Sequence, residues 1–236
     1  MVTTLNSKRI MAILLSAGLV TGIGLSSAQA ADRYINVSAT GSVKVTPDTV
    51  RINASVSVVG ATSGAAQSSA SKAASAVRSA LSSNGIATQY IKTQTMTIYP
   101  EYNYTQDKGS VLTGYRASQS FEIIVRNAKN AGTVVDAIVA AGGDALQLEG
   151  VTPYVFNTTT STDAARTAAI TNAKAKATHY AKLLGVKLYS VTSLDETTAP
   201  SPYPIMMATA KLDSGATHVD LGQQDVSVSV TVKWSI

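Results

Sequence analysis

The chain has 236 residues, with 19 Lys and Arg against 14 Asp and Glu, a formal charge of +5 at pH 7, and no cysteine. The absence of cysteine excludes thiol catalysis, thiolate metal sites and disulfide exchange. The basic residues are spread singly rather than in a stripe with interleaved aromatics, so the composition predicts no nucleic-acid binding.

The first thirty residues have the pattern of a cleavable secretory signal peptide. Two basic residues precede an uncharged apolar run over 10–25, and Ala28-Gln29-Ala30 then supplies the small-x-small motif read by signal peptidase. We predict cleavage between Ala30 and Ala31, which leaves residues 31–236 with a charge of +3 in the periplasm. A transmembrane anchor is the alternative, but a run of 16 residues is short for a span, which needs roughly 20.

Residues 34–60 alternate between apolar and polar side chains, the period of half-buried strands. Gly41-Ser42 predicts a break and Pro47-Asp48 a turn. From residue 62 the period changes to three or four, which predicts a helix that ends at Asn84-Gly85. Its inner face would consist of Ala66, Ala70, Ala73, Val77 and Leu81. These small residues predict a helix that lies close to a sheet.

Two further strands are predicted over 90–101 and 115–127, joined by a polar loop over 102–114 as in an extended hairpin. Tyr99, Tyr102 and Tyr104 gather there. Tyrosine buries area and tolerates water, so they could form a contact surface. An ordinary amphipathic sheet face explains them equally simply, and we prefer it.

The second half of the chain predicts two more helices and three strands. A helix over 130–141 ends at Gly142-Gly143, a strand follows over 148–156, and a helix over 162–184 ends at Gly185. The second helix would bury Val134, Val135, Ile138 and Ala141. The third helix would bury Ile170, Ala173, Ala177, Tyr180 or Ala181, and Leu184. A strand is predicted over 187–194.

The chain ends on its clearest strand, after an irregular segment over 197–222. The residues of one face are all apolar: Val226, Val228, Val230, Val232 and Trp234. The element order predicts an α+β fold, with a mostly antiparallel sheet and three helices packed against it. A membrane barrel is the alternative for such strands, but long alanine-rich helices do not belong in one.

The residues that could take part in catalysis or metal binding do not form a recognisable motif. His218 and Asp220 could be two ligands of a metal, but a closed site needs three or four, and His179 is far away in the sequence. We take one histidine to be partly buried and the other to lie in a loop. No Gly-x-Ser-x-Gly motif is present. The carboxylates Glu101, Glu122, Glu149 and Asp195-Glu196 fit a solvated surface as well as they fit acid–base catalysis. The sequence therefore predicts no enzyme, no cofactor and no metal.

Several motifs together resemble the SIMPL-domain family of bacterial periplasmic and secreted proteins. They are Ile35-Asn36-Val37-Ser38-Ala39-Thr40-Gly41-Ser42-Val43, Thr46-Pro47-Asp48-Thr49-Val50-Arg51, Gly114-Tyr115-Arg116-Ala117-Ser118, Val125-Arg126-Asn127, Ala173-Lys174-Ala175-Lys176-Ala177, Tyr180-Ala181-Lys182-Leu183-Leu184-Gly185 and the final strand. One departure is Leu221-Gly222, where we expect a Pro-Gly turn.

The resemblance implies an α+β periplasmic protein, a link to protection from oxidative stress, and assembly into a ring-shaped, channel-like homo-oligomer. It implies no catalytic residues. Association with the cell envelope or outer membrane is also expected. We place the contact between subunits at Tyr203, Ile205, Met206 and Met207, because long apolar connections stiffened by proline are suited to docking. The alternative is a smaller periplasmic protein that binds an envelope ligand.

Overall fold

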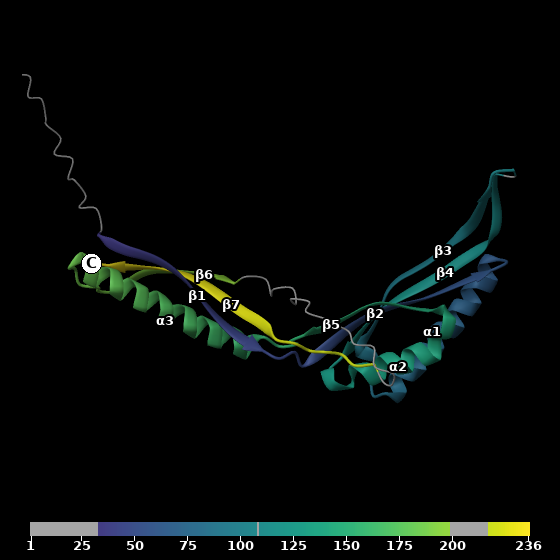
Figure 1. Ribbon diagram of the computed structural model, residues 1–236, viewed down its shortest axis with the longest axis horizontal. Helices are drawn as coiled ribbons and strands as arrows, with labels where there is room; N and C mark the ends of the chain where they lie inside the picture. Colours follow the sequence, from purple (N-terminus) through teal and green to yellow (C-terminus); the bar gives the residue numbers. More distant parts are fainter. Residues whose placement is uncertain (1–32, 108, 199–216) are drawn as a thin grey trace, which may run out of the picture. The chain divides into compact units, whose positions relative to one another are not determined.

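The computed structural model describes residues 33–107, 109–198 and 217–236, which form two antiparallel sheets, each covered by helices (Figure 1). The strands are β1 (Tyr34–Val45), β2 (Thr49–Gly60), β3 (Ile91–Thr105), β4 (Gly109–Val125), β5 (Leu146–Tyr154), β6 (Val191–Thr198) and β7 (Gln224–Ser235). The helices are α1 (Ser63–Ser83), α2 (Ala131–Gly142) and α3 (Thr159–Leu184). The predicted α+β class is confirmed, with the strands divided between two sheets.

Sheet A has the strand order β1-β7-β6 and packs its inner face against α3. β7 is its central strand, and the predicted apolar face is buried, with Trp234 only 6% exposed. β1 and β7 pair without a register shift from Tyr34 opposite Ser235 to Val45 opposite Gln224. The first and last described strands therefore lie side by side.

The buried face of α3 consists of alanine alone: Ala165, Ala169, Ala173, Ala177 and Ala181. The predicted stripe was right at its alanines and wrong at its larger residues. Ile170 is 41% exposed and Leu184 is 64% exposed. A face without side chains beyond Cβ lets the helix backbone lie close to the sheet, which leaves no room there for a longer side chain.

Gly41 makes this close approach possible from the strand side. A Cβ at Gly41 would overlap the carbonyl oxygen of Ala165 and the backbone nitrogen of Ala169. β1 runs through Gly41 without interruption, so the predicted break is wrong. The glycine is a packing contact, because a residue with a side chain could not occupy the position without moving the helix.

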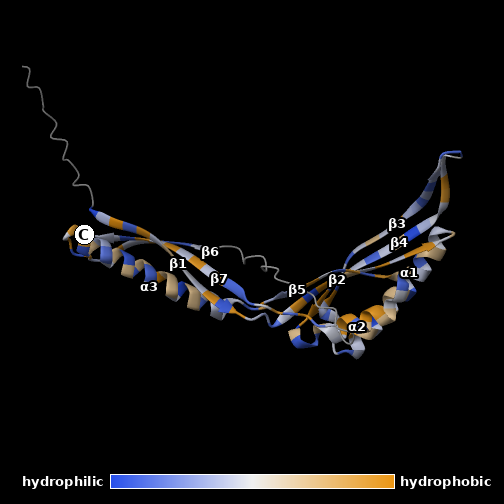
Figure 2. Cartoon of the chain, viewed as in Figure 1, coloured by the Kyte–Doolittle hydropathy of each residue, from blue (hydrophilic) through white to orange (hydrophobic). Residues whose placement is uncertain are grey.

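Sheet B has the strand order β3-β4-β2-β5 and carries α1 and α2 on one face. Its core centres on Phe121, Ile52 and Leu81, all fully buried. The predicted inner face of α1 is buried at Ala66, Ala70, Val77 and Leu81, whereas Ala74 is buried in place of Ala73, which is only partly buried. Val134, Val135 and Ile138 of α2 are buried as predicted, and Figure 2 shows α2 as a strongly hydrophobic helix.

The helix ends follow local sequence signals. The Thr62 hydroxyl accepts the N–H of Ala65 at 3.2 Å and so caps α1. α3 ends at Gly185, whose φ of 66° lies in the left-handed region, and the N–H of Val186 then donates to the carbonyl of Ala181 at 3.0 Å. This arrangement satisfies a carbonyl group that would otherwise lack a partner.

The hairpin of β3 and β4 is longer than predicted. The expected loop over 102–114 is strand up to Thr105 and again from Gly109, with register shifts at Thr93/Thr95 and at Glu101/Tyr102. Tyrosine, valine and leucine in that segment favour strand geometry despite the polar residues between them. The strand predicted over 187–194 is also displaced, because β6 begins at Val191.

A short connection precedes β7 and packs onto sheet B. Val219 and Leu221 contact the core of sheet B, and Gly222 takes a positive φ of 59°. Leu221-Gly222 thus takes the place of the expected Pro-Gly turn, since glycine supplies the required conformation by itself. Gln224 then accepts the N–H of Val155 at 3.3 Å and donates to the carbonyl of Pro153 at 3.0 Å.

Candidate functional site

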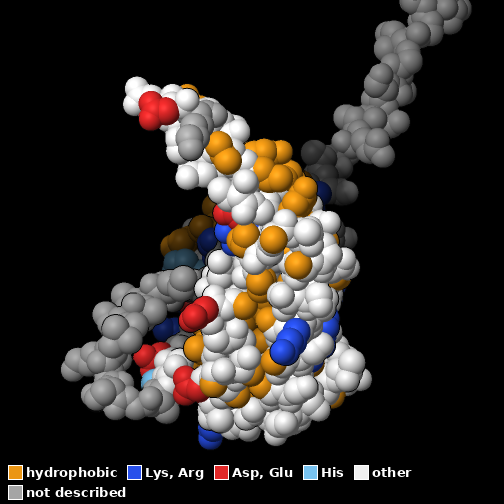
Figure 3. Space-filling view, turned by 90° about the vertical axis from the view of Figure 1, so that its right-hand side faces the viewer, with side chains coloured by type: hydrophobic (Ala, Val, Ile, Leu, Met, Phe, Trp, Pro, Cys, Tyr) orange, Lys and Arg blue, Asp and Glu red, His pale blue; other side chains and the backbone are white. Residues whose placement is uncertain are grey.

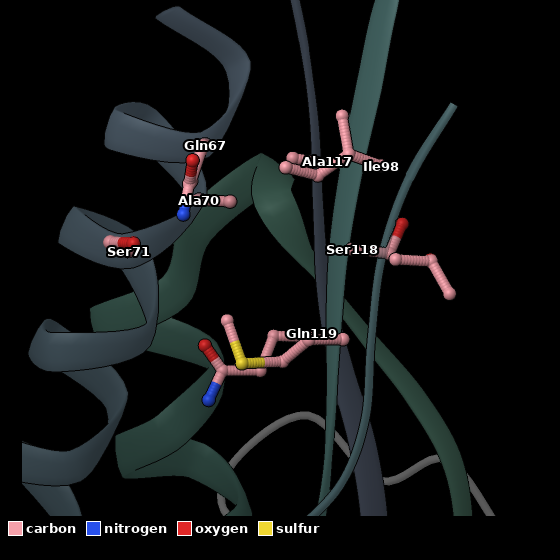
Figure 4. A pocket seen from close by; sticks show the side chains of 9 residues that line it. Gln67, Ala70, Ser71, Ile98, Ala117, Ser118 and Gln119 are labelled. Atoms are coloured by element: carbon pink, nitrogen blue, oxygen red, sulfur yellow. The ribbon is translucent and has the colours of Figure 1, made fainter. Parts of the chain in front are cut away.

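A groove lies between α1 and β3, one of the two edge strands of sheet B. α1 packs mainly over β2 and β4, where Ala66 and Ala70 meet Ala117, and leaves β3 less covered. The groove has a volume of about 360 Å³. Figure 4 shows Gln67 and Ala70 of α1 across from Ile98 and Gln119 of the sheet. Its position follows from the small residues of α1, which bring the helix close to β4.

The groove is mostly apolar, with a polar end. Met96 and Ile98 border it and are 60% and 45% exposed, and the buried Ala117 contributes to its wall. Gln119 is only 6% exposed, and its amide donates to the Thr93 hydroxyl at 3.3 Å. The arrangement suits an apolar group that carries or adjoins a hydrogen-bonding group.

Large apolar side chains are exposed along the same hairpin and the adjoining end of β2, and we call them the hairpin band. Its members are Val59, Met96, Ile98, Tyr99, Tyr102, Tyr104, Val111 and Leu112. Figure 3 shows hydrophobic side chains gathered on the face that carries the hairpin and α1. A gathering of exposed large apolar side chains marks interaction sites. The sequence drew attention to the three tyrosines, whereas the aliphatic members were missed.

Three of the five candidate carboxylates are held by arginines, while Glu149 and Asp195 are exposed. Arg116 donates to Glu101 Oε1 at 2.7 Å, and this hydrogen bond raises the pKa of Arg116. Glu122 lies 3.6 Å from Arg51, and Glu196 lies 2.7 Å from Arg166. The hydrogen bond with Glu196 likewise raises the pKa of Arg166. Each of these three carboxylates faces a cation instead of a second carboxylate, which is an arrangement typical of structural ion pairs.

The histidines are both exposed, so the expectation of a partly buried one is wrong. His218 Nε2 lies 3.3 Å from Asp220 Oδ1 beside a second cavity of about 290 Å³ next to α2. His179 is an exposed residue of α3 and is not among the residues that line that cavity. Within the described ranges, no three His, Asp or Glu side chains come together in a way that could hold a metal ion.

Comparison with known proteins identifies the family. Residues 35–234 match the family model SIMPL, described as a protein of unknown function (DUF541). The chain belongs to the SIMPL family. The match covers both sheets and all three helices, so the resemblance seen in the sequence motifs is confirmed.

Curated relatives of this SIMPL protein include the 26 kDa periplasmic immunogenic protein of Brucella melitensis, 30% identical over 86% of this chain and 84% of the relative. The uncharacterized protein YggE of Escherichia coli K12 is 31% identical over 74% of this chain and 71% of the relative. YggE of Edwardsiella ictaluri is 28% identical over 84% and 85%.

Some sequence predictions concern residues beyond those described. The processing site at Ala30 and Ala31 lies outside the described residues, as do the proposed contact residues Tyr203, Ile205, Met206 and Met207. Within the part of the SIMPL chain that is described, no helix combines the length and the apolar character needed to cross a membrane.

Proposed function

We propose that this SIMPL protein is a non-catalytic periplasmic protein of the cell envelope that works as the subunit of a homo-oligomer. The hairpin band carries the proposal, because it gathers eight exposed aliphatic and aromatic side chains along one hairpin and the adjoining end of β2. The periplasmic part draws support from the signal-like first thirty residues and from the relative that is named a periplasmic protein.

The non-catalytic part of the proposal draws support from the described side chains. Glu101, Glu122 and Glu196 are engaged by arginines, and the two histidines lie in separate places. A catalytic site needs a nucleophile or an acid–base group in hydrogen-bond reach of a second functional group, facing a cavity. The groove beside α1 contains amides and hydroxyls and no ionisable group.

A ring or channel-like assembly needs two different contacts on each subunit, since one self-complementary contact closes a dimer. We propose the hairpin band for one contact and Tyr203, Ile205, Met206 and Met207 for the other. Replacing these last four residues with serine is expected to lower the assembled mass while the subunit stays folded. An unchanged mass would exclude that segment as a contact.

Multi-angle light scattering of the purified protein tests the central claim. We expect a mass several times that of one chain, stable on dilution. A monomeric mass at micromolar concentration would overturn the homo-oligomer. The measurement assumes nothing about a ligand, so it separates assembly from the alternative considered next.

The second candidate function is binding of a small apolar envelope ligand, and the groove beside α1 favours it. Its volume of about 360 Å³ falls at the lower end of the range for ligand sites. The fluorescent probe anilinonaphthalene sulfonate is the test. Saturable binding that Ala70→Leu abolishes, in a protein that is monomeric, would support this function over assembly. The matched control is Ala80→Leu, on the same helix away from the groove.

The proposal includes a link to oxidative stress. It comes from the family resemblance, and the side chain that fits it is Met96, whose thioether is exposed at the groove. Thioethers consume peroxide by forming sulfoxide, which reductases reverse. Because the chain has no cysteine, any direct reaction of this kind depends on methionine.

A further inference from the structure

We propose that two copies of this chain join through β3, whose outer side pairs in antiparallel fashion with β3 of the second copy. The two copies of sheet B would then form one continuous sheet of eight strands. The inference rests on the proposed self-assembly and names its interface.

β3 presents a long edge that is regular between its two register shifts, over residues 95–101. It has 15 residues, and within the residues that the structure describes no strand pairs with its outer side. Pro100 lacks an N–H, so its backbone must face outward for the ladder with β4 to stay intact. Because backbone direction alternates along a strand, Met96 and Ile98 also present their N–H and C=O groups outward. These groups are available to a pairing strand.

The other three edges are blunted by recognisable devices. Along β1, Asn172 of α3 donates to the carbonyl of Thr40 at 3.0 Å, and Lys176 donates to that of Ser38 at 3.1 Å. β6 carries the adjacent acids Asp195-Glu196. β5 has only nine residues, contains Pro153 and has an irregular register opposite β2. Native edges are usually protected in such ways, so the long regular stretch at the centre of β3 indicates a partner.

The geometry of two-fold pairing favours a second copy of this chain as the partner. Lys92 and Glu101 are the two charged residues of β3, and Arg116 of the same chain already pairs with Glu101. Antiparallel pairing around the middle of the strand keeps the two Lys92 side chains apart. Two-fold pairing also covers the outer edge of β3 in both copies at once. Pairing of β3 with β5 or β6 of another copy would instead leave the β3 edge of that copy uncovered.

The apolar side chains at the centre of β3 strengthen the same contact. Met96 and Ile98 point to the α1 side of the sheet, opposite Gln119 and Ala117 of β4. In the paired strands these side chains would lie beside their counterparts from the second copy, and the groove next to α1 would receive them. Backbone pairing gives affinity in such contacts, and side-chain pockets give specificity.

A single-cysteine scan tests the geometry, since the chain has no cysteine of its own. The variants are Thr95→Cys, Met96→Cys, Thr97→Cys, Ile98→Cys and Tyr99→Cys. A disulfide needs Cα atoms about 4.4–6.8 Å apart, which two copies of one residue reach only near the two-fold axis. We expect one or two adjacent variants to give a disulfide-linked dimer under mild oxidation. The control Leu183→Cys, at an exposed position on α3, should give none.

Ile98→Pro and Ile98→Lys test the same contact by disruption, with Leu183→Lys as the matched control. Light scattering should show the assembled mass reduced by half or more in the Ile98 variants and unchanged in the control. If the parent is a monomer, the proposed function fails together with this inference. If the parent is an oligomer whose mass survives both Ile98 variants, and no cysteine variant cross-links, the inference alone is overturned. Folding of each variant is checked by circular dichroism, and the cysteine scan decides where a variant does not fold.

Discussion

Asp48 Oδ1 accepts the backbone N–H of Phe156 at 2.9 Å, although 108 residues separate the two in the sequence. The same carboxylate accepts the Thr49 hydroxyl at 2.9 Å, and the carbonyl of Asp48 accepts the N–H of Ala128 at 3.0 Å. One residue at the turn between β1 and β2 thus holds the segment after β4 and the segment after β5.

The hydrogen bonds of Asp48 predict a pH-dependent contribution to stability. Burial raises the pKa of Asp48, but the bonds from Phe156 and Thr49 and the charge of Arg126 together lower it below the usual value. A carboxylate whose folded pKa is depressed stabilises the fold above its unfolded pKa, about 3.9, and loses that effect as pH falls through the folded value.

Asp48→Asn keeps an acceptor oxygen and removes the charge. Because the carboxylate is exposed and screened by solvent, we expect the change to lower the free energy of unfolding by only about 0.5–1 kcal/mol at pH 7 and by progressively less below about pH 4. Urea denaturation at both pH values measures the difference. Asp107→Asn, at the exposed turn of the β3–β4 hairpin, is the control and should change stability by less than about 0.5 kcal/mol. A constant difference at all pH values would show that the charge plays no part.

Gly41→Ala tests the contact between β1 and α3. The added Cβ overlaps the backbone of Ala165 and Ala169, so helix and strand must separate, at a cost of roughly 2–3 kcal/mol. Thermal denaturation followed by circular dichroism measures it. Gly150→Ala, in β5, is the matched control, because a Cβ there meets no atom within 4 Å. Equal melting temperatures for the two variants would contradict the close packing.

Trp234→Ala tests whether β7 anchors sheet A. The side chain is 6% exposed and packs in the core beneath α3, so its removal should lower the free energy of unfolding by about 3–5 kcal/mol. Tyr189→Ala, at a position 67% exposed, should have a much smaller effect. Deletion of residues 224–236 removes the central strand of the sheet and should leave insoluble protein. A soluble and cooperatively folding truncation would mean that β7 is an exchangeable arm.

Met96 should be oxidised readily by dilute hydrogen peroxide in the single subunit, where its side chain is 60% exposed, and more slowly in the assembled protein, where the second copy would cover it. Peptide mass spectrometry would detect the added oxygen on the fragment containing Met96, and Met96→Leu provides the control that lacks it. Sulfoxide at the centre of the proposed β3 contact makes an apolar side chain polar, so light scattering should also show a lower assembled mass in the parent and no change in Met96→Leu. Peroxide treatment that leaves Met96 unmodified would remove it as a reactive group.

The elements with strong periodic signals were predictable from sequence. Alternating valines up to Trp234 identified β7 and its buried face, and Val134, Val135 and Ile138 identified the inner face of α2. In both elements the buried residues are also the most apolar ones. Pattern and packing agree there, so reasoning from periodicity succeeds.

The same reasoning misread α3, because alanine carries little hydrophobic signal. Ile170 and Leu184 dominate the pattern of that helix, yet the contact with sheet A selects small residues by distance. Gly41 was misread for a related reason, since a glycine in a strand marks either a break or a close approach. Only the position of α3 distinguishes the two. The division into two sheets depends on which distant strands pair, and local periodicity does not contain that information.

Only part of the candidate site could be predicted from the sequence. Tyr99, Tyr102 and Tyr104 stood out by residue type, but their interpretation as an ordinary sheet face overlooked Met96 and Ile98 beside them. The groove exists because α1 leaves β3 less covered, which follows from tertiary placement. The edge position of β3 likewise follows from the strand order.

The pairing of β1 with β7 has a consequence for how the chain must fold. Ser38 and Thr231, whose hydroxyls lie 2.8 Å apart, are separated by 193 residues. The strands of sheet B all come from one continuous stretch, 49–154, and can assemble as that stretch emerges. β1 is synthesised before all of them, but it cannot form its ladder until β7, the last strand, has been synthesised. During that interval the apolar side of β1, with Ile35 and Val37, stays uncovered and open to chaperones or to mispairing.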